Sequence, residues 1–163
     1  MFSRLSLKAL LVSALLGASS LSFAALQMET IAEGLDTPWS VAELPDGGFL
    51  VTERPGSIKH VAPSGDMTAV TGVPEVFAKR QGGLFDVVLH PDFASNNTVF
   101  LAYAAGSEDS NRTTVARGVL DGSALTDVTV IFEVSPTKRG GGHFGGRMAF
   151  LACLLYTSDA ADD

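Results

Sequence analysis

An internal repeat limits the possible folds of this chain more than any other feature of its sequence. Residues 39–46 (WSVAELPD) align with residues 85–92 (FDVVLHPD) at an offset of 46 residues. Both copies read as an aromatic residue, a polar residue, an apolar pair and a final Pro-Asp. A repeat of this length made of short strands is typical of β-propeller blades. A third copy begins at residues 146–150 (GRMAF) and lacks the Pro-Asp.

Short strands separated by Pro- and Gly-rich turns account for most of the chain after the first 24 residues. Two of these strands are almost continuous apolar runs, which predicts that both of their faces are covered, as between packed blades. A β-sandwich also uses short strands at regular intervals, but the repeated motif favours a propeller of which about two blades are present. The predicted strands are residues 39–44, 49–53, 57–61, 84–89, 99–104, 113–120 and 128–134.

The first 24 residues are predicted to be an export signal. Arg4 and Lys8 precede an apolar run at residues 9–16, and Ser22 and Ala24 are small residues suited to a cleavage site. A membrane anchor is the alternative, but spanning a bilayer takes about 20 apolar residues. We therefore expect a periplasmic or secreted mature protein that begins at residue 25.

The end of the chain departs from the repeat. Residues 153–162 (CLLYTSDAAD) carry the only cysteine. They can be encoded by TGT CTC TTA TAC ACA TCT GAC GCT GCC GAC, which resembles a transposase-type sequencing adapter. We expect residues 151–163 to be a non-native tail; a genuine short acidic tail is the alternative. Residues 25–150 are then the N-terminal part of a longer propeller.

Charge and cysteine content exclude several classes of partner and site. The formal net charge is −7, and it is still −6 once the two basic residues of the leader and three acidic residues of the tail are left out. An acidic surface argues against nucleic acid or an anionic membrane as a partner. With one cysteine no disulfide framework is available, and no His/Cys spacing of a zinc site occurs, so we predict no metal ligand from the residues alone.

Gln81 is the first candidate site residue. It lies in residues 78–84 (AKRQGGL), directly before the strand of the second repeat. Its amide offers donors and an acceptor suited to a sugar hydroxyl, and the following glycines let the backbone approach a ligand or turn sharply. The alternative is an ordinary polar loop with a Gly-Gly turn.

His143 is the second candidate. It lies in residues 138–147 (KRGGGHFGGR), where neighbouring glycines cannot shield its imidazole. A group with a pKa near neutrality can accept a proton from a hydroxyl. The alternative is a flexible loop in which His143 has no function. This segment lacks the Gly-Lys-Ser/Thr ending of a phosphate-binding loop.

Four further residues are interpreted mainly as structural. His90 precedes the repeated Pro-Asp. His60 is expected on a short strand near a blade edge, in contact with solvent. Asp86 replaces Ser40 of the first copy inside an apolar strand, where a charge needs hydrogen bonds; it either supports the structure or orients a pocket residue. Trp39 is expected in the core.

Three ordered motifs resemble a known family. Residues 34–42 (GLDTPWSVA), 81–93 (QGGLFDVVLHPDF) and 143–147 (HFGGR) are similar to the opening of periplasmic, pyrroloquinoline quinone (PQQ)-dependent aldose sugar dehydrogenases, of the glucose/sorbosone dehydrogenases. The resemblance covers residues 31–150. It implies a six-bladed propeller that binds the quinone and the sugar at the top centre of the ring.

The resemblance also implies roles for single residues. His143 matches the catalytic base that removes the proton of the anomeric hydroxyl while a hydride passes to PQQ. Gln81 matches a glutamine that lines the sugar and quinone pocket, so it is both substrate-binding and cofactor-binding. Gly142 replaces a residue that is polar in the family, which bears on substrate preference. The cations that hold the quinone carboxylates and the ligands of Ca²⁺ are expected in later blades, so this part alone is expected to be inactive.

Two other functions stay open at this stage. A non-enzymatic propeller binds a ligand through its top face, and a propeller lactonase needs a carboxylate-rich metal site in the ring centre. The expected partners of a dehydrogenase are an aldose and an electron acceptor. The sequence identifies neither of these, nor the oligomeric state.

Overall fold

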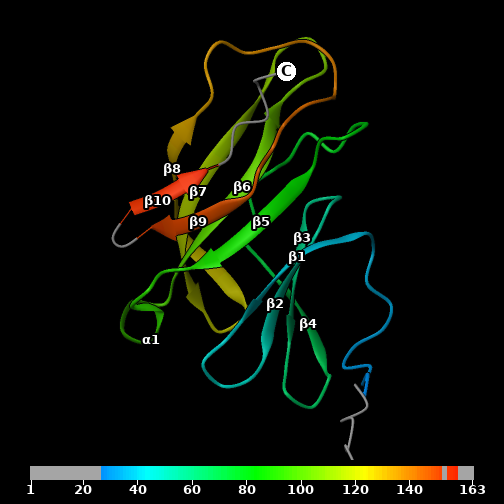
Figure 1. The fold of residues 1–163 in the computed structure, drawn as a ribbon, viewed down its shortest axis with the longest axis vertical. Helices are drawn as coiled ribbons and strands as arrows, with labels where there is room; N and C mark the ends of the chain where they lie inside the picture. Colours follow the sequence, from blue (N-terminus) through cyan, green and yellow to red (C-terminus); the bar gives the residue numbers. More distant parts are fainter. Residues whose placement is uncertain (1–26, 152–153, 158–163) are drawn as a thin grey trace, which may run out of the picture.

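The computed structural model describes residues 27–151 and 154–157. These residues form two four-stranded antiparallel sheets and a two-stranded hairpin (Figure 1). The predicted export signal lies outside the described residues, and so does the predicted tail apart from Leu151 and residues 154–157. Both assignments therefore stay predictions.

The first sheet contains its four strands in sequence order, as a propeller blade does. The three strands predicted here are confirmed to within one residue at each end. The fourth is short and largely exposed, with no apolar alternation that marks it in the sequence. The strands are β1 (Pro38–Glu43), β2 (Phe49–Glu53), β3 (Ser57–Val61) and β4 (Met67–Val70).

The second sheet repeats this arrangement. A single helical turn, α1 (Phe93–Asn96), connects its first two strands, in a segment expected to be a turn. The central strands are buried along most of their length, as the continuous apolar runs predict. The last strand begins earlier than expected because Gly122 and Ser123 form the tight turn before it. The strands are β5 (Leu84–Leu89), β6 (Thr98–Gly106), β7 (Asn111–Asp121) and β8 (Ala124–Glu133).

A third sheet starts after the second. Strands β9 (Met148–Leu151) and β10 (Leu154–Thr157) form an antiparallel hairpin, and β9 lies against β5. A two-layer sandwich has no place for this third sheet. The predicted all-β propeller, with about two blades present, is therefore confirmed.

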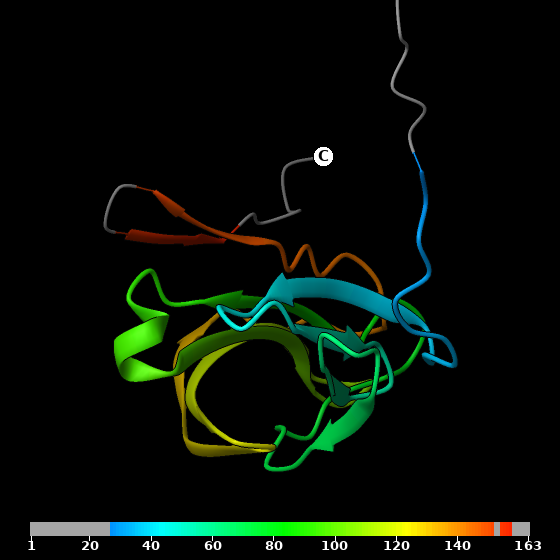
Figure 2. The same cartoon turned by 90° about the horizontal axis from the view of Figure 1, so that it is seen from below.

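The sequence repeat explains how the blades pack. Strand β5 of the second blade packs against β1 and β2 of the first (Figure 1). Trp39 and Phe85, which occupy the same position in the two repeats, have ring centroids 5.5 Å apart. Seen from below, the first blade, the second blade and the hairpin lie next to one another (Figure 2). Equivalent residues of successive blades thus become neighbours at the blade interface.

The hydrophobic core is divided between these interfaces. One buried cluster joins Leu50 and Ile58 of the first blade to Leu84, Val87 and Leu101 of the second. A second cluster joins the second blade to the segment around β9, and it includes Phe77, Phe85, Phe100, Phe144 and Met148. In a propeller each sheet buries apolar side chains against the next sheet in the series, whereas a β-sandwich has a single core between two sheets.

Several apolar side chains of the two blades are exposed. They lie on β1, at the outer face of the first blade, and on β8, the last strand of the second: Val41, Val128, Val130, Ile131 and Phe132. Apolar patches of this kind usually mark surfaces that other structure covers. Within the residues described, no helix has the length and hydropathy to cross a membrane.

The expectation for His60 is wrong. The sequence predicts that it lies near a blade edge in contact with solvent, but β3 is an inner strand that pairs with both β2 and β4. The side chain is half-buried and its Nε2 atom is fully buried with no hydrogen-bond partner. His90, in contrast, is structural as predicted, because its Nδ1 accepts the backbone N–H of Asp92 at 3.0 Å.

Tyr103 predicts how stability depends on alkaline pH. Burial, and to a smaller degree the charge of Glu133, raises the pKa of its phenol above the ordinary value of 10.0. The unfolded chain then loses this proton at lower pH than the folded chain, so Tyr103 stabilises the fold below about pH 10 and this contribution is lost as pH rises further. We expect the free energy of unfolding of the wild type, relative to that of Tyr103→Phe, to fall as the pH rises above about 10 in denaturant titrations of the full-length protein. A difference independent of pH would contradict this.

Candidate functional site

Two loops meet at the end of the sheets where β5 and β9 begin (Figure 1). One loop, residues 79–83, leads into β5, and the other, residues 138–147, leads into β9. The backbone N–H of Gln81 donates to the carbonyl of Gly141 at 2.8 Å. The fold therefore brings together the two segments that the sequence singled out.

The two predicted site residues are in direct contact. The backbone N–H of His143 donates to Oε1 of Gln81 at 2.9 Å. His143 is exposed, as the glycine-rich sequence predicts, and has a positive φ of 57°. Among the described residues its imidazole makes no hydrogen bond. The ring is therefore accessible to a substrate while its backbone is held.

Lys138 holds the other side of His143. Its Nζ atom donates to the carbonyl of His143 at 2.5 Å and also to the carbonyl of Gly142. The same ammonium lies 3.7 Å from the centre of the Phe144 ring, a cation–π contact with a buried aromatic residue. Nothing in the sequence singles out Lys138, because its role depends on the folded path of the loop.

Asn111 fastens the loop to the second blade. It is fully buried, and its Nδ2 donates to the carbonyls of Ser107 at 2.7 Å and Gly140 at 2.6 Å. Its backbone pairs with that of Lys138 through two hydrogen bonds of 2.9 Å. Nothing near Asn111 in the sequence points to this role, since Gly140 lies 29 residues away.

The glycines after Gln81 make room for protein backbone. A Cβ on Gly83 would lie 2.2 Å from the carbonyl oxygen of Arg54, and one on Gly82 would lie 2.3 Å from that of Phe77. Arg54 also donates from Nη1 to the carbonyl of Arg80 at 2.8 Å. The close backbone approach expected here is therefore made by the first blade and the loop itself.

Asp86 joins three successive blades. Its Oδ1 accepts hydrogen bonds from the hydroxyl of Ser40 at 2.5 Å and from Nη1 of Arg147 at 3.2 Å, and its Oδ2 accepts the N–H of Met148 at 2.8 Å. The carboxylate is almost fully buried, which satisfies the expectation that a charge at this position must be hydrogen-bonded. These hydrogen bonds support a structural role for Asp86, and they also hold Arg147, which lines a pocket beside the first blade.

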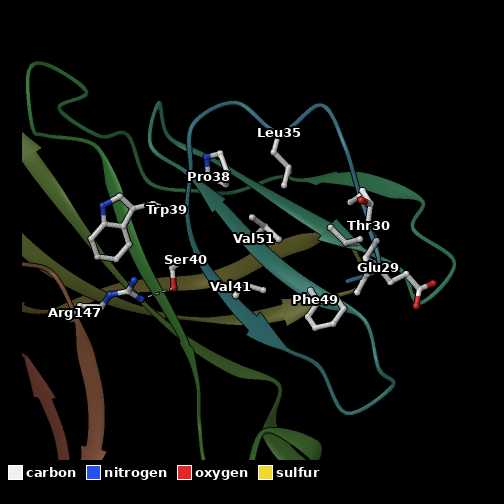
Figure 3. A pocket seen from close by; sticks show the side chains of 13 residues that line it. Glu29, Thr30, Leu35, Pro38, Trp39, Ser40, Val41, Phe49, Val51 and Arg147 are labelled. Carbon is white, nitrogen blue, oxygen red and sulfur yellow. Dashed lines mark hydrogen bonds between the residues drawn. The ribbon is translucent and has the colours of Figure 1, made fainter. Parts of the chain in front are cut away.

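Arg147 connects this network to the surface. Its guanidinium lies 4.4 Å from the ring centre of Trp39, and its side chain is 63% exposed. Figure 3 shows Arg147, Trp39 and Ser40 at the edge of a pocket of about 570 Å³ that the first blade and residues 29–35 line. Neither Gln81 nor His143 lines this pocket. It lies against the open apolar face of β1 and β2, and Arg147, the last residue of the second loop, is the residue that it shares with the two-loop site.

The two-loop site is basic although the chain is acidic. Five of the nine Lys and Arg residues that follow the leader lie on its two loops: Lys79, Arg80, Lys138, Arg139 and Arg147. Glu108 and Asp109 lie next to the second loop, and Asp109 is 4.0 Å from Arg139. The balance of charge favours an anionic ligand. In the described part of the chain no three His, Cys, Asp or Glu side chains converge on a point where a Ca²⁺ ion could bind.

Comparisons with known proteins agree with the sequence motifs. A family described as glucose/sorbosone dehydrogenase matches residues 35–161. Aldose sugar dehydrogenase YliI of Escherichia coli is 42% identical over 132 residues, which cover 78% of this chain and 36% of that protein. The uncharacterized protein slr1608 of Synechocystis sp. is 47% identical over 130 residues, which cover 74% of this chain and 32% of that protein.

Solved structures show the same similarity. The soluble aldose sugar dehydrogenase of Escherichia coli in its apo form superposes with a TM-score of 0.71 at 39% identity, over 75% of this chain and 37% of that one. The PQQ-bound aldose sugar dehydrogenase of Streptomyces coelicolor superposes with a TM-score of 0.70 at 33% identity, over 83% and 42%. The chain thus spans about a third of the curated relatives. Two complete blades amount to one third of a six-bladed ring.

Proposed function

Because the chain belongs to the glucose/sorbosone dehydrogenase family, we propose that it is part of an exported, PQQ-dependent enzyme that oxidises the anomeric hydroxyl of an aldose to a lactone. One observation carries the proposal. The contact between Gln81 and His143 presents an accessible imidazole at the end of the propeller where two basic loops meet. A periplasmic or secreted location follows from the predicted export signal.

His143 acts as the general base in this proposal. Its exposed imidazole can take the proton of the anomeric hydroxyl. When bound, the quinone supplies the acceptor for the hydride that leaves the same carbon. The sugar carbon thus loses a proton through its oxygen and a hydride directly, which together make the two-electron oxidation to the lactone.

Gln81 and the basic side chains bind and orient. The Oε1 atom of Gln81 is engaged by His143, and its amide nitrogen donates to no described residue, so it can donate to a sugar or quinone oxygen. Lys79 and Arg80 of the same loop add positive charge near the site, and the cations that hold the quinone carboxylates directly are placed in the remaining blades. We place the ligands of Ca²⁺ in the remaining blades.

The test uses the full-length gene product. We expect the apo-protein, supplied with PQQ and Ca²⁺, to reduce a redox dye when an aldose is added, and to do so in proportion to bound PQQ. Residues 25–150 purified alone should show no turnover, since the remaining blades that complete the pocket and cover the apolar faces of β1 and β8 are missing.

Other outcomes point to the alternatives. A folded full-length protein that binds sugars and never reduces the dye is a binding propeller. Hydrolysis of a lactone without PQQ identifies a lactonase. Dye reduction by the isolated residues 25–150 would contradict the expected inactivity of this part.

A further inference from the structure

His143 occupies a backbone conformation that needs support. A φ of 57° lies in the left-handed region, which costs free energy for a residue with a Cβ. Three glycines precede it and Phe144 and two further glycines follow, so the loop has little stiffness of its own. The position of the imidazole therefore depends on side-chain contacts and not on the stiffness of the glycine segment.

Two side chains supply these contacts, one on each side of the residue. Gln81 accepts the N–H of His143 at 2.9 Å, and Lys138 donates to its carbonyl at 2.5 Å. Neither bond involves the imidazole. Both peptide groups that flank the α-carbon of His143 are thereby fixed, while the ring stays accessible.

Each of the two side chains is itself anchored in a blade. Lys138 lies over the ring of Phe144, and its backbone pairs with that of buried Asn111. The loop of Gln81 is held by Arg54, whose guanidinium donates to the carbonyls of Arg80 and Gly82 at 2.8 and 3.2 Å. Contacts from both the first and the second blade therefore hold the two side chains that bind the backbone of His143.

We propose that Gln81 and Lys138 form a clamp on the backbone of His143 that positions its imidazole for proton transfer. Both are positioning residues in this respect, and Gln81 has this role through Oε1 in addition to any contact of its amide nitrogen. The inference rests on the proposed function, because it assigns to the clamp the orientation of the same base. Misplacing a reacting group by about 1 Å lowers a rate by about 100-fold, so the effect is expected on kcat.

The variants separate the clamp from binding. Gln81→Glu keeps an oxygen acceptor and loses the amide donors, whereas Gln81→Leu loses the acceptor as well. In the full-length holoenzyme we expect Gln81→Leu to lower kcat at saturating PQQ and aldose by about 10- to 100-fold, and Gln81→Glu to weaken PQQ binding while retaining more of kcat than Gln81→Leu. Lys138→Met should lower kcat by about 10- to 100-fold with KM within about threefold, and Lys138→Arg should restore part of the loss. Lys59→Met, the same substitution on β3, is the control and should change neither kcat nor KM.

A second readout does not depend on catalysis. Hydrogen exchange at the His143 amide of the full-length apo-protein should accelerate at least about tenfold in Gln81→Leu and stay near the wild-type rate in Gln81→Glu. Absence of aldose oxidation in the wild type would refute the proposed function and leave the exchange result to decide on the clamp. Unchanged exchange and unchanged kcat in Gln81→Leu would overturn the clamp. If Lys138→Met does not fold, the two Gln81 variants still decide.

Discussion

Replacing His143 with alanine is expected to abolish most of the activity of the full-length enzyme. Removal of a general base typically lowers a rate by about 100- to 10,000-fold. The loss should appear in kcat at saturating PQQ and aldose, because the imidazole makes no hydrogen bond within the described structure and its removal disturbs no packing. The unfolding midpoint and the affinity for PQQ should stay close to those of the wild type.

Two comparisons make this result specific to the base. His143→Asn retains a residue type that tolerates positive φ and lacks a base at neutral pH, so it should be as inactive as the alanine variant. His60→Gln changes a histidine of the inner strand β3 and should leave kcat within about twofold, as expected of a substitution away from the reacting atoms. Added imidazole should restore part of the activity of His143→Ala and should not increase the activity of the wild type. A kcat of His143→Ala within about threefold of the wild type would exclude His143 as the base.

The fold could be predicted in large part because a repeat in sequence becomes a repeat in space. The aromatic positions of the two motifs, Trp39 and Phe85, are neighbours at the blade interface. Elements outside the motif were missed for physical reasons. Strand β4 is held by its pairing with β3 and not by an apolar pattern, and α1 is one turn long, too short for helical periodicity to show.

The candidate site could be predicted only as two separate points. Gln81 and His143 could be identified as candidates because each is a polar residue next to glycines. Their contact across 62 residues, and the anchoring of the loop by Asn111 and Lys138, depend on how successive blades pack. The sequence also could not show what approaches the Gly82-Gly83 pair, because the carbonyl of Arg54, next to Gly83, belongs to the first blade.

Asp86 shows how one substitution within the repeat can support the assembly of blades. The first copy has Ser40 at this position, and the two side chains hydrogen-bond to each other across the interface at 2.5 Å. The same carboxylate reaches forward to Arg147 and to the N–H of Met148 in the third sheet. A serine at position 86 is too short to make both connections. The charge that is costly in an apolar strand is therefore offset by partners from both neighbouring blades.

Asp86→Ala is accordingly expected to destabilise the full-length protein by about 2–4 kcal/mol. The substitution leaves the hydroxyl of Ser40 and the N–H of Met148 without their acceptor, and each unpaired buried group costs about 1–3 kcal/mol. Arg147 contributes less, because its guanidinium is mostly exposed and stays hydrated. Denaturant titrations of the two proteins measure the difference directly.

Matched variants separate the hydrogen bonds of Asp86 from a general effect of losing a carboxylate. Asp92→Ala removes the exposed carboxylate of the same repeat copy and should change stability by less than about 0.5 kcal/mol. Asp86→Asn keeps the volume and one acceptor and should lie between the wild type and the alanine variant. A double-mutant cycle of Ser40→Ala with Asp86→Ala should give a coupling of about 0.5–3 kcal/mol, since the two groups are in contact. Strict additivity of these two changes would show that the inter-blade hydrogen bond contributes nothing to stability.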